Sequence, residues 1–260
     1  ALLIAGDVYD KSIPTVEAIQ LFDDFLCELS KRKVQTFIIS GNHDSAERMA
    51  FGGRLMKESG VYVAPVYAGK TQAVVLEDEW GPINIYLLPF VKPANVKRFF
   101  EDEQIENYTD AIRVAVEQMK LNTDERNVLV THQFVTGAKR SESEDISVGG
   151  TDNVDASVFD EFDYVALGHI HGPQKIGRET VRYCGTPLKY SFSEIHHKKS
   201  VTIVEMKEKG NVEISTKELA PLRDWCEMKG TYMELTEKAY YENLDQDSYM
   251  HITLTDEEDI

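Results

Sequence analysis

The sequence predicts an α/β fold, because short apolar runs alternate with helix-like segments along the first part of the chain. The runs lack the period-two alternation of half-exposed strands and are typical of strands that are buried on both faces. Residues 12–33 place apolar side chains at helical spacing behind the helix-start residue Pro14. The predicted buried strands lie at residues 1–5, 34–40, 127–131 and 163–168.

Shorter elements are expected between these strands. Residues 45–59 are helix-prone, and Thr109 is expected to be the N-cap of a further helix. Residues 137–153 are rich in Ser, Gly and charge and predict a long exposed loop. Short strands are expected at residues 61–63, 72–76 and 83–88.

The C-terminal part of the chain has a different pattern. It is rich in strand-like segments up to about Pro221, where the pattern breaks. Residues 231–236, 237–244 and 249–255 then predict a small βαβ unit. We therefore expect a core domain over residues 1–221 and the beginning of a second, smaller domain over residues 222–260.

Composition narrows the class of protein. The 45 acidic and 28 basic residues leave a formal charge of −17, which argues against tight, sequence-independent binding of nucleic acid by this chain alone. The three cysteines are far apart and odd in number, which favours a reducing, cytoplasmic compartment over a disulfide framework or a cysteine zinc site. No apolar run approaches the roughly 18 residues of a membrane span, so no membrane partner is expected.

Each of the four buried strands ends in residues of metal-ligand type. In α/β sheets, sites form where the carboxyl ends of parallel strands meet, so these side chains are expected to lie together. Glycines beside them would let the chain turn sharply near a ligand. The predicted ligands are Asp7, Asn42, His132, His169 and His171.

The residue types suggest the metals. Imidazole, carboxylate and amide oxygen together suit Mn²⁺, Fe²⁺ or Zn²⁺ better than Ca²⁺, which prefers shells made of oxygen alone. The carboxylate of Asp7 has two oxygens and can bridge two ions. Two ions about 3.5–4 Å apart can bind a phosphoryl group and activate a water for in-line attack.

Three more residues are candidates for the same site. His43 directly follows Asn42, so we expect it to face the substrate as a proton donor or charge stabiliser, with Asp44 orienting its ring. Asp10 is a candidate supporting residue. Taken singly, a carboxylate after a strand is usually a turn residue and a lone histidine usually belongs to the core. Four strand ends together favour the functional interpretation.

The cations in residues 196–199 are interpreted differently. The run His-His-Lys-Lys is typical of a solvated loop, and this interpretation is preferred to a phosphate contact.

The motif order Gly-Asp-x-x-Asp, Gly-Asn-His-Asp, a strand-end His and Gly-His-x-His resembles the calcineurin-like metallophosphoesterase superfamily. Within it, "GDVYD", "GNHDS", "GHIHGPQ" and "YCGTPLKYSFSE" are similar to the bacterial nuclease members that work with an ATPase. The resemblance implies a four-layer α-β-β-α sandwich followed by a small α+β capping domain.

The resemblance also implies residue roles. Asp7 would be the bridging ligand, Asn42, His132 and His169 would complete one metal site, and His171 would serve the other. His43 would be the catalytic histidine, paired with Asp44.

The implied activity is hydrolysis of DNA phosphodiesters with two divalent ions, with Mn²⁺ favoured. It comprises 3′–5′ exonuclease action on duplex ends and endonuclease action on single strands or hairpins, in DNA repair and recombination. The implied partners are DNA, a coiled-coil ATPase and a second copy of the chain within a heterotetramer.

One feature of the family pattern is missing. No Asp-x-His precedes Ala1, although that motif supplies two ligands to the metal that His171 serves, so we expect this chain alone to bind that metal poorly and to be nearly inactive. Two alternatives remain open. One is a phosphatase or small-molecule phosphodiesterase on the same fold, and the other is a non-catalytic scaffold that docks the ATPase.

Overall fold

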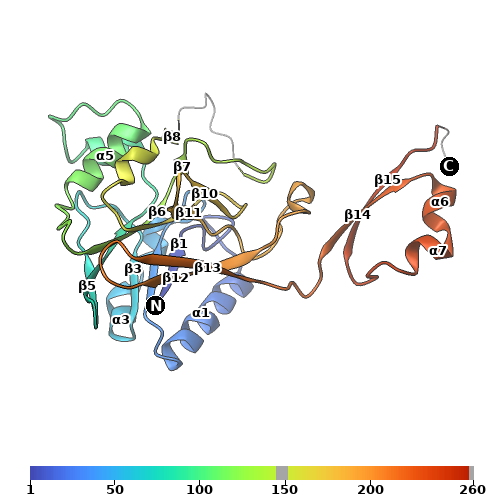
Figure 1. The fold of residues 1–260 in the computed structure, drawn as a ribbon, viewed down its shortest axis with the longest axis horizontal. Helices are drawn as coiled ribbons and strands as arrows, with labels where there is room; N and C mark the ends of the chain where they lie inside the picture. The colour runs from blue at the N-terminus through green and yellow to red at the C-terminus, as the bar shows by residue number, and fades with distance from the viewer. Residues whose placement is uncertain (145–151, 258–260) are drawn as a thin grey trace.

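Two β-sheets packed face to face form the centre of the protein, seen in a computed structural model that describes residues 1–144 and 152–257 (Figure 1). The first sheet is parallel, with the strand order β1-β2-β3. The second has the order β10-β11-β9-β6-β5-β4, and its four central strands are parallel. The strands are β1 (Leu2–Ala5), β2 (Thr36–Ile39), β3 (Val61–Ala64), β4 (Val74–Asp78), β5 (Gly81–Leu88), β6 (Arg126–His132), β9 (Tyr164–Gly168), β10 (Gln174–Ile176) and β11 (Arg178–Tyr183).

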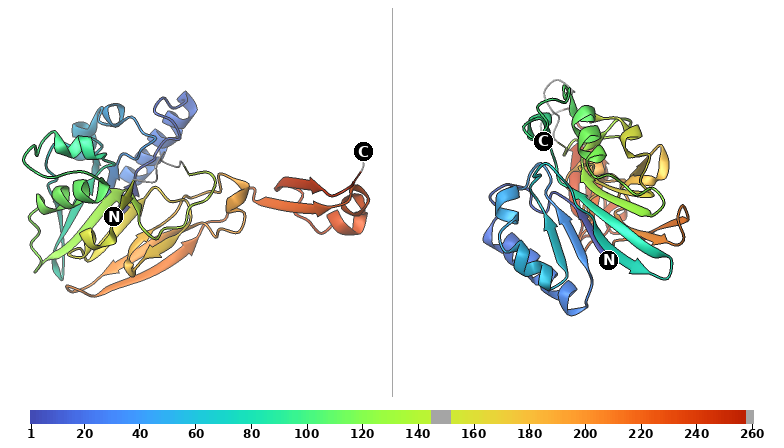
Figure 2. Two further views of the ribbon diagram at one scale, coloured as in Figure 1. Left: turned by 90° about the horizontal axis from the view of Figure 1, so that it is seen from above. Right: turned by 90° about the vertical axis from the view of Figure 1, so that its left-hand side faces the viewer.

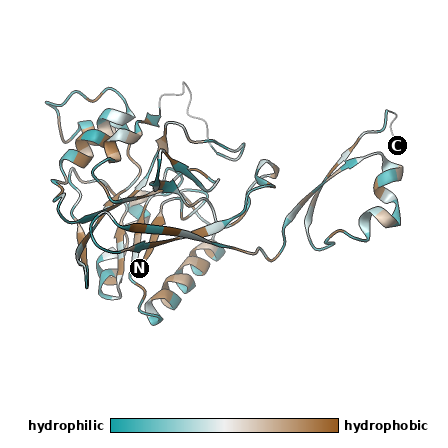
Figure 3. Cartoon of the chain, viewed as in Figure 1, coloured by the Kyte–Doolittle hydropathy of each residue, from teal (hydrophilic) through white to brown (hydrophobic). Residues whose placement is uncertain are grey.

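Apolar side chains fill the space between the two sheets. Phe37 and Ile39 of β2 meet Leu87 of β5 and Val130 of β6 in one buried cluster. Each large side chain that is fully buried contributes about 1.5–3 kcal/mol relative to exposure, so this layer holds the sheets together. In Figure 3, hydrophobic colour marks strands of the sandwich and bands along α1.

Helices cover the outer faces of both sheets. Leu26 of α1 (Val16–Lys31) packs on Ile38 and Val61 of the first sheet, and α3 (Gly53–Glu58) follows along the same face. The buried side of α5 (Tyr108–Glu117) packs on the second sheet. The right-hand view of Figure 2 shows these helices on opposite sides of the sheets. The predicted α-β-β-α sandwich is therefore confirmed.

Helix boundaries differ from the prediction in two places. Asn107, not Thr109, is the N-cap of α5, because its side-chain oxygen accepts the backbone N–H of Asp110 at 3.0 Å. Thr109 lies in the first turn. The helix-prone residues 45–59 form two short helices, α2 (Ala46–Met49) and α3, separated near Gly52, whose φ is +74°. The short helix α4 (Pro93–Lys97) precedes α5.

The hairpin β12 (Ser200–Met206) and β13 (Val212–Glu218) completes the sandwich, with Val204, Met206 and Ile214 packed on the core between the sheets. The remaining short elements are β7 (Phe134–Val135), β8 (Asn153–Val154), and the 3₁₀ turns η1 (Ala156–Phe159) and η2 (Phe192–Glu194).

A separate βαβ unit follows, at the right of Figure 1. It contains β14 (Trp225–Gly230), α6 (Tyr232–Thr236), α7 (Lys238–Tyr241) and β15 (Tyr249–Leu254), with β14 and β15 parallel. The βαβ order agrees with the prediction, but its first strand lies earlier than expected. Residues 231–236 are helical because Thr231 and Glu234 form a capping box.

In the part of the chain that the structure describes, no helix is both long and apolar enough to cross a membrane.

Candidate metal centre

Four strand ends converge at one edge of the sandwich. β1 and β2 are parallel, as are β6 and β9, and β1 packs against both β6 and β9. Their carboxyl ends bring together four predicted ligands from residues far apart in the sequence. We call Asp7, Asn42, His132 and His169 the strand-end cluster.

Glycines make this convergence possible. A Cβ on Gly168 would lie 1.8 Å from the carbonyl oxygen of Ala5, and one on Gly41 would lie 2.0 Å from a carboxylate oxygen of Asp7. Neither contact is sterically possible, so only glycine allows these segments to approach so closely. Two ligand residues themselves have left-handed backbone, with φ of 48° for Asp7 and 105° for His169.

The protonation of His132 follows from its contacts. The ring is buried, and its Nδ1 lies 2.7 Å from the carbonyl oxygen of Ala5, which can only accept, so Nδ1 carries a proton and donates it. In the neutral ring, Nε2 then has a lone pair facing Asp7 Oδ2 at 3.1 Å. Two acceptors at this distance need a second proton or a cation between them.

His169 is a neutral ring with one unused nitrogen. Its Nδ1 lies 3.0 Å from Asn42 Oδ1, which is also 2.9 Å from Nε2 of His132. Nε2 of His169 is buried and has no hydrogen-bond partner among the described residues. Burial, and next the charge of His132, lower the pKa of His169 to about 3, so the ring is neutral at neutral pH and its Nε2 can act as a ligand atom.

Asp7 supplies the negative charge. Burial disfavours its ionisation, but His132 and the backbone N–H of His43, which donates to Oδ1 at 3.0 Å, outweigh that effect and lower the pKa of Asp7. Ligand atoms of Asp7, His132 and His169 all lie within 4.8 Å of one another. One carboxylate, an amide oxygen and two imidazoles fit a divalent transition metal.

His43 and Asp44 lie beside this cluster. Nδ1 of His43 is 2.9 Å from the main-chain oxygen of Asp10, so Asp10 supports the histidine through its backbone. The Asp44 carboxylate accepts the N–H groups of Gly41, Val8 and Tyr9 at 2.8, 3.2 and 3.0 Å, joining the ends of β1 and β2. Pairing of Asp44 with the ring of His43 stays a prediction.

His171 belongs to a second group of contacts. Its Nδ1 lies 2.9 Å from Glu194 Oε1 and 3.0 Å from Ser143 Oγ. Lys199 donates to Glu194 Oε2 at 2.6 Å. We call His171, Ser143, Glu194 and Lys199 the Glu194 network. The part that His171 takes in metal binding stays a prediction.

The structure contradicts one expectation and qualifies another. Lys199 was expected to be a solvated loop cation, but it is 5% exposed and paired with Glu194. Residues 137–153 were expected to form a long exposed loop; the described residues 137–144 do form a loop with exposed residues, but Glu144 is buried and accepts the backbone N–H of His171. Residues 145–151 of that loop lie outside the described residues. Glu194 was not singled out, because its partner is 23 residues away and no spacing marks it.

Comparison with known proteins agrees with the geometry. The profile of the family described as calcineurin-like phosphoesterase matches residues 1–173. A curated relative, the SbcD component of the nuclease SbcCD from Staphylococcus epidermidis, is 33% identical over 261 residues, which cover 98% of this chain and 68% of the relative. The predicted resemblance to the superfamily, and to its bacterial SbcD members, is thus confirmed. The chain belongs to the calcineurin-like phosphoesterase family and is a phosphoester hydrolase.

Proposed function

We propose that this chain is the nuclease subunit of an SbcC–SbcD-type complex, which hydrolyses DNA phosphodiesters with two divalent metal ions. The observation that carries the proposal is the convergence of Asp7, His132 and His169, whose ligand atoms lie within 4.8 Å of one another at the strand ends. The proposed activity is that of a 3′–5′ exonuclease on duplex ends and an endonuclease on single strands and hairpins, in repair and recombination.

The strand-end cluster would hold one ion, and His171 together with Asp7 would serve the other. Mn²⁺ is the favoured ion, and Fe²⁺ and Zn²⁺ suit the same ligands. Such ions polarise a phosphoryl oxygen and lower the pKa of a bound water. His43, held by its contacts to Asp7 and Asp10, would donate a proton to the leaving oxygen or stabilise its charge.

The catalytic role proposed for His43 can be distinguished experimentally from the role of the proposed metal ligands. In a longer chain that carries the Asp-x-His motif, His43→Ala should abolish Mn²⁺-dependent cleavage of labelled hairpin DNA and leave Mn²⁺ binding, measured by calorimetry, intact. Asp7→Ala should abolish both DNA cleavage and Mn²⁺ binding, because the carboxylate contacts His132 directly. The exposed His196 offers a matched control, His196→Ala, which should change neither. Full cleavage by His43→Ala would reject the assignment.

The same assays address the two alternatives. Turnover of a small chromogenic phosphodiester without DNA cleavage would favour a small-molecule phosphodiesterase. Mn²⁺ binding without any turnover by a longer chain that carries the Asp-x-His motif, in the presence of the ATPase, would favour a scaffold.

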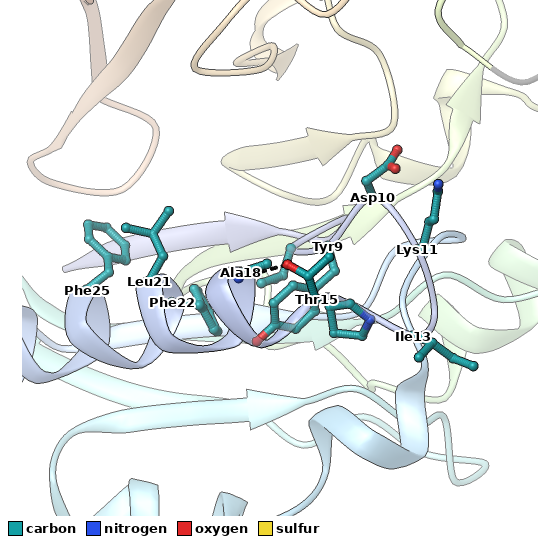
Figure 4. Close-up of a pocket in the computed structure, with 11 residues that line it drawn as sticks. Tyr9, Asp10, Lys11, Ile13, Thr15, Ala18, Leu21, Phe22 and Phe25 are labelled. Carbon is teal, nitrogen blue, oxygen red and sulfur yellow. Dashed lines mark hydrogen bonds between the residues drawn. The ribbon is translucent and has the colours of Figure 1, made fainter.

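The chain also offers a surface for the proposed homodimer. Ile13, Leu21 and Phe25 line an open groove of about 540 Å³ along α1 (Figure 4), and they are 70%, 73% and 46% exposed. Phe51 and Leu55, which follow on the α2–α3 segment, are 89% and 78% exposed. Apolar patches of this kind are rare on monomers and mark interaction sites. We propose that a second copy of the chain covers them.

Charge substitution on this surface tests the dimer. Leu21→Glu should shift the mass measured by light scattering from dimer to monomer without changing the far-ultraviolet circular dichroism spectrum of the folded chain. Val75→Glu alters another exposed apolar residue, on β4, and should leave the mass unchanged. A monomeric unsubstituted chain would reject the assignment.

The remaining proposals concern the ends of the chain and its surroundings. Residues 222–260 would begin a capping domain after a core of residues 1–221. The free cysteines Cys27, Cys184 and Cys226 are compatible with the reducing cytoplasm.

Because the chain has a net charge of −17, its affinity for DNA would come mainly from dimerisation and the SbcC-type ATPase. Tight DNA binding by the isolated chain at physiological salt would contradict this.

A further inference from the structure

Glu194 is a fully buried carboxylate on the η2 turn, with 0% of its surface exposed. Its Oε2 accepts from Nζ of Lys199 at 2.6 Å, and its Oε1 accepts from Ser143 Oγ and from the ring of His171. Removing two charges from water is costly, and a buried ion pair often contributes little net stability. A pair of this kind therefore calls for a role beyond stability.

The contacts of this pair are directed at one residue, His171. Glu194 faces the ring nitrogen Nδ1, and Nζ of Lys199 donates to the main-chain oxygen of His171 at 2.9 Å. The N–H of His171 donates to Glu144. Ring and backbone are thus both held.

The direction of these bonds determines the chemistry of the ring. A carboxylate that pairs with Lys199 can only accept, so Nδ1 of His171 must carry the proton that it shares with Glu194. The lone pair of the neutral ring then lies on Nε2. Histidine ligands in metal sites typically donate their other N–H to a carboxylate in this way, which fixes tautomer and ring orientation.

We propose that Glu194 is a positioning residue for metal binding, which holds His171 as the tautomer that presents the Nε2 lone pair to the ion, and that Lys199 keeps Glu194 in place. The inference rests on the role of His171 in the proposed function. A purely structural pair would join β12 to the η2 turn through Lys199 alone, without directing Oε1 at the ring.

The test combines a metal-free and a metal-bound measurement on the full chain. In the metal-free protein, imidazole ¹⁵N chemical shifts report the tautomer of His171. We expect the Nδ1–H form in the unsubstituted chain and a mixture of tautomers in Glu194→Gln. In calorimetric Mn²⁺ titrations, Glu194→Gln should weaken binding of the ion that His171 serves by about 10–100-fold, as expected for a residue that orients a ligand. Binding of the ion that depends on His169 should be unchanged.

Matched variants separate this effect from general damage. Glu179→Gln makes the same chemical change at an exposed carboxylate of β11 that pairs with Lys175 and Arg182, and should leave tautomer and affinity unchanged. Ser143→Ala removes one donor to Glu194 without leaving a buried charge unpaired. It should produce a smaller change in the same direction, and it decides the question if Glu194→Gln fails to fold.

Two results would overturn the inference. The first is an unchanged tautomer and unchanged Mn²⁺ affinity in folded Glu194→Gln, or in Ser143→Ala if Glu194→Gln does not fold. The second is a changed tautomer with unchanged affinity, because Glu194 would then orient a ring that binds no ion. Failure of the nuclease proposal looks different: no DNA is cut, while Mn²⁺ binding still depends on Glu194.

Discussion

The strand-end cluster and the Glu194 network hold their histidines by different means. In the strand-end cluster, main-chain geometry positions the side chains, because glycines let four strand ends approach and the carbonyl of Ala5 accepts from His132. In the Glu194 network, side chains from separate loops form a buried ion pair around His171. The first depends on backbone shape and the second on charge.

This difference determines which changes each region tolerates. Backbone positioning fails when atoms are added, since nothing can move aside without displacing a strand. A charged network fails when a partner is removed, since the remaining charge is left unpaired in the interior. Substitutions that add volume and substitutions that remove charge therefore separate the two regions.

The largest effect is expected from Gly168→Ala. The added methyl would lie 1.8 Å from the carbonyl oxygen of Ala5, so β1 or β9 must shift. We expect the free energy of unfolding in urea to fall by about 3 kcal/mol. Gly53→Ala in α3 is the control, because the added Cβ would lie 3.9 Å from its nearest neighbour, Val63 of β3, and it should be neutral or stabilising by up to about 1 kcal/mol. Equal stabilities would refute the steric argument.

Metal binding should give the next largest effect. Mn²⁺ at about 100 times its dissociation constant stabilises the folded chain by about 2.7 kcal/mol, and a chelator should remove this increment. His169→Gln should lose most of it, because the unused Nε2 is buried within the strand-end cluster. His196→Gln should retain it. If thermal unfolding shows the same metal increment in both variants, His169 is not a ligand.

Asp44→Asn tests the hydrogen bonds behind the strand-end cluster. The carboxylate accepts three backbone N–H groups, and an amide nitrogen can accept none, so at least one donor loses its partner. Hydrogen bonds to charged groups contribute about 1.5–3 kcal/mol, so we expect a loss of about 2 kcal/mol in chemical unfolding. Asp124→Asn, at an exposed position, should change stability by less than about 0.5 kcal/mol. A similar value for both would show that the Asp44 bonds are weak.

The smallest effect over a single pH unit is a pH dependence that distinguishes the two regions in the metal-free protein. His169 has a folded pKa of about 3, below its ordinary value of 6.5, so between these values only the unfolded state binds the proton. Stability therefore falls as pH drops below 6.5, by at most about 1.4 kcal/mol per pH unit. The pKa of Glu194 is lowered from 4.5, despite burial, by its bonds to His171 and Lys199, so its contribution is lost only below pH 4.5.

Difference curves of unfolding free energy against pH measure these windows. The unfolding free energy of the unsubstituted chain minus that of His169→Gln should decrease as pH falls below 6.5. The corresponding difference for Glu194→Gln should decrease only below pH 4.5. Coincident windows would contradict the assignment of the two groups.

The sequence predicted the strand-end cluster because its residues follow recognisable elements. Asp7, Asn42, His132 and His169 each come after a buried apolar strand, and the edge at which parallel strands end is a general property of α/β sheets. The alternation of strands and helices was predictable for the same reason, whereas the four-layer sandwich was implied by the resemblance to the metallophosphoesterase superfamily. Strand and helix periodicity are local, so one sequence contains enough information to place them.

The Glu194 network could not be predicted, because its contacts lie between loops. The run that ends in Lys199 has the composition of a solvated surface. Only the folded chain shows that Nζ of Lys199 lies 2.6 Å from Oε2 of Glu194. The predicted N-cap of α5 was also wrong, by two residues. Both Asn107 and Thr109 are capping types, and which one caps α5 depends on the path of the preceding loop.

The left-handed backbone of Asp7 and His169 has a kinetic consequence. Each such conformation costs about 1–3 kcal/mol and persists only because the surrounding fold enforces it. This cost is met when the chain folds, before any ion arrives. The centre is therefore preorganised, and ion capture requires desolvation of the ion and its ligands rather than the ordering of a loop.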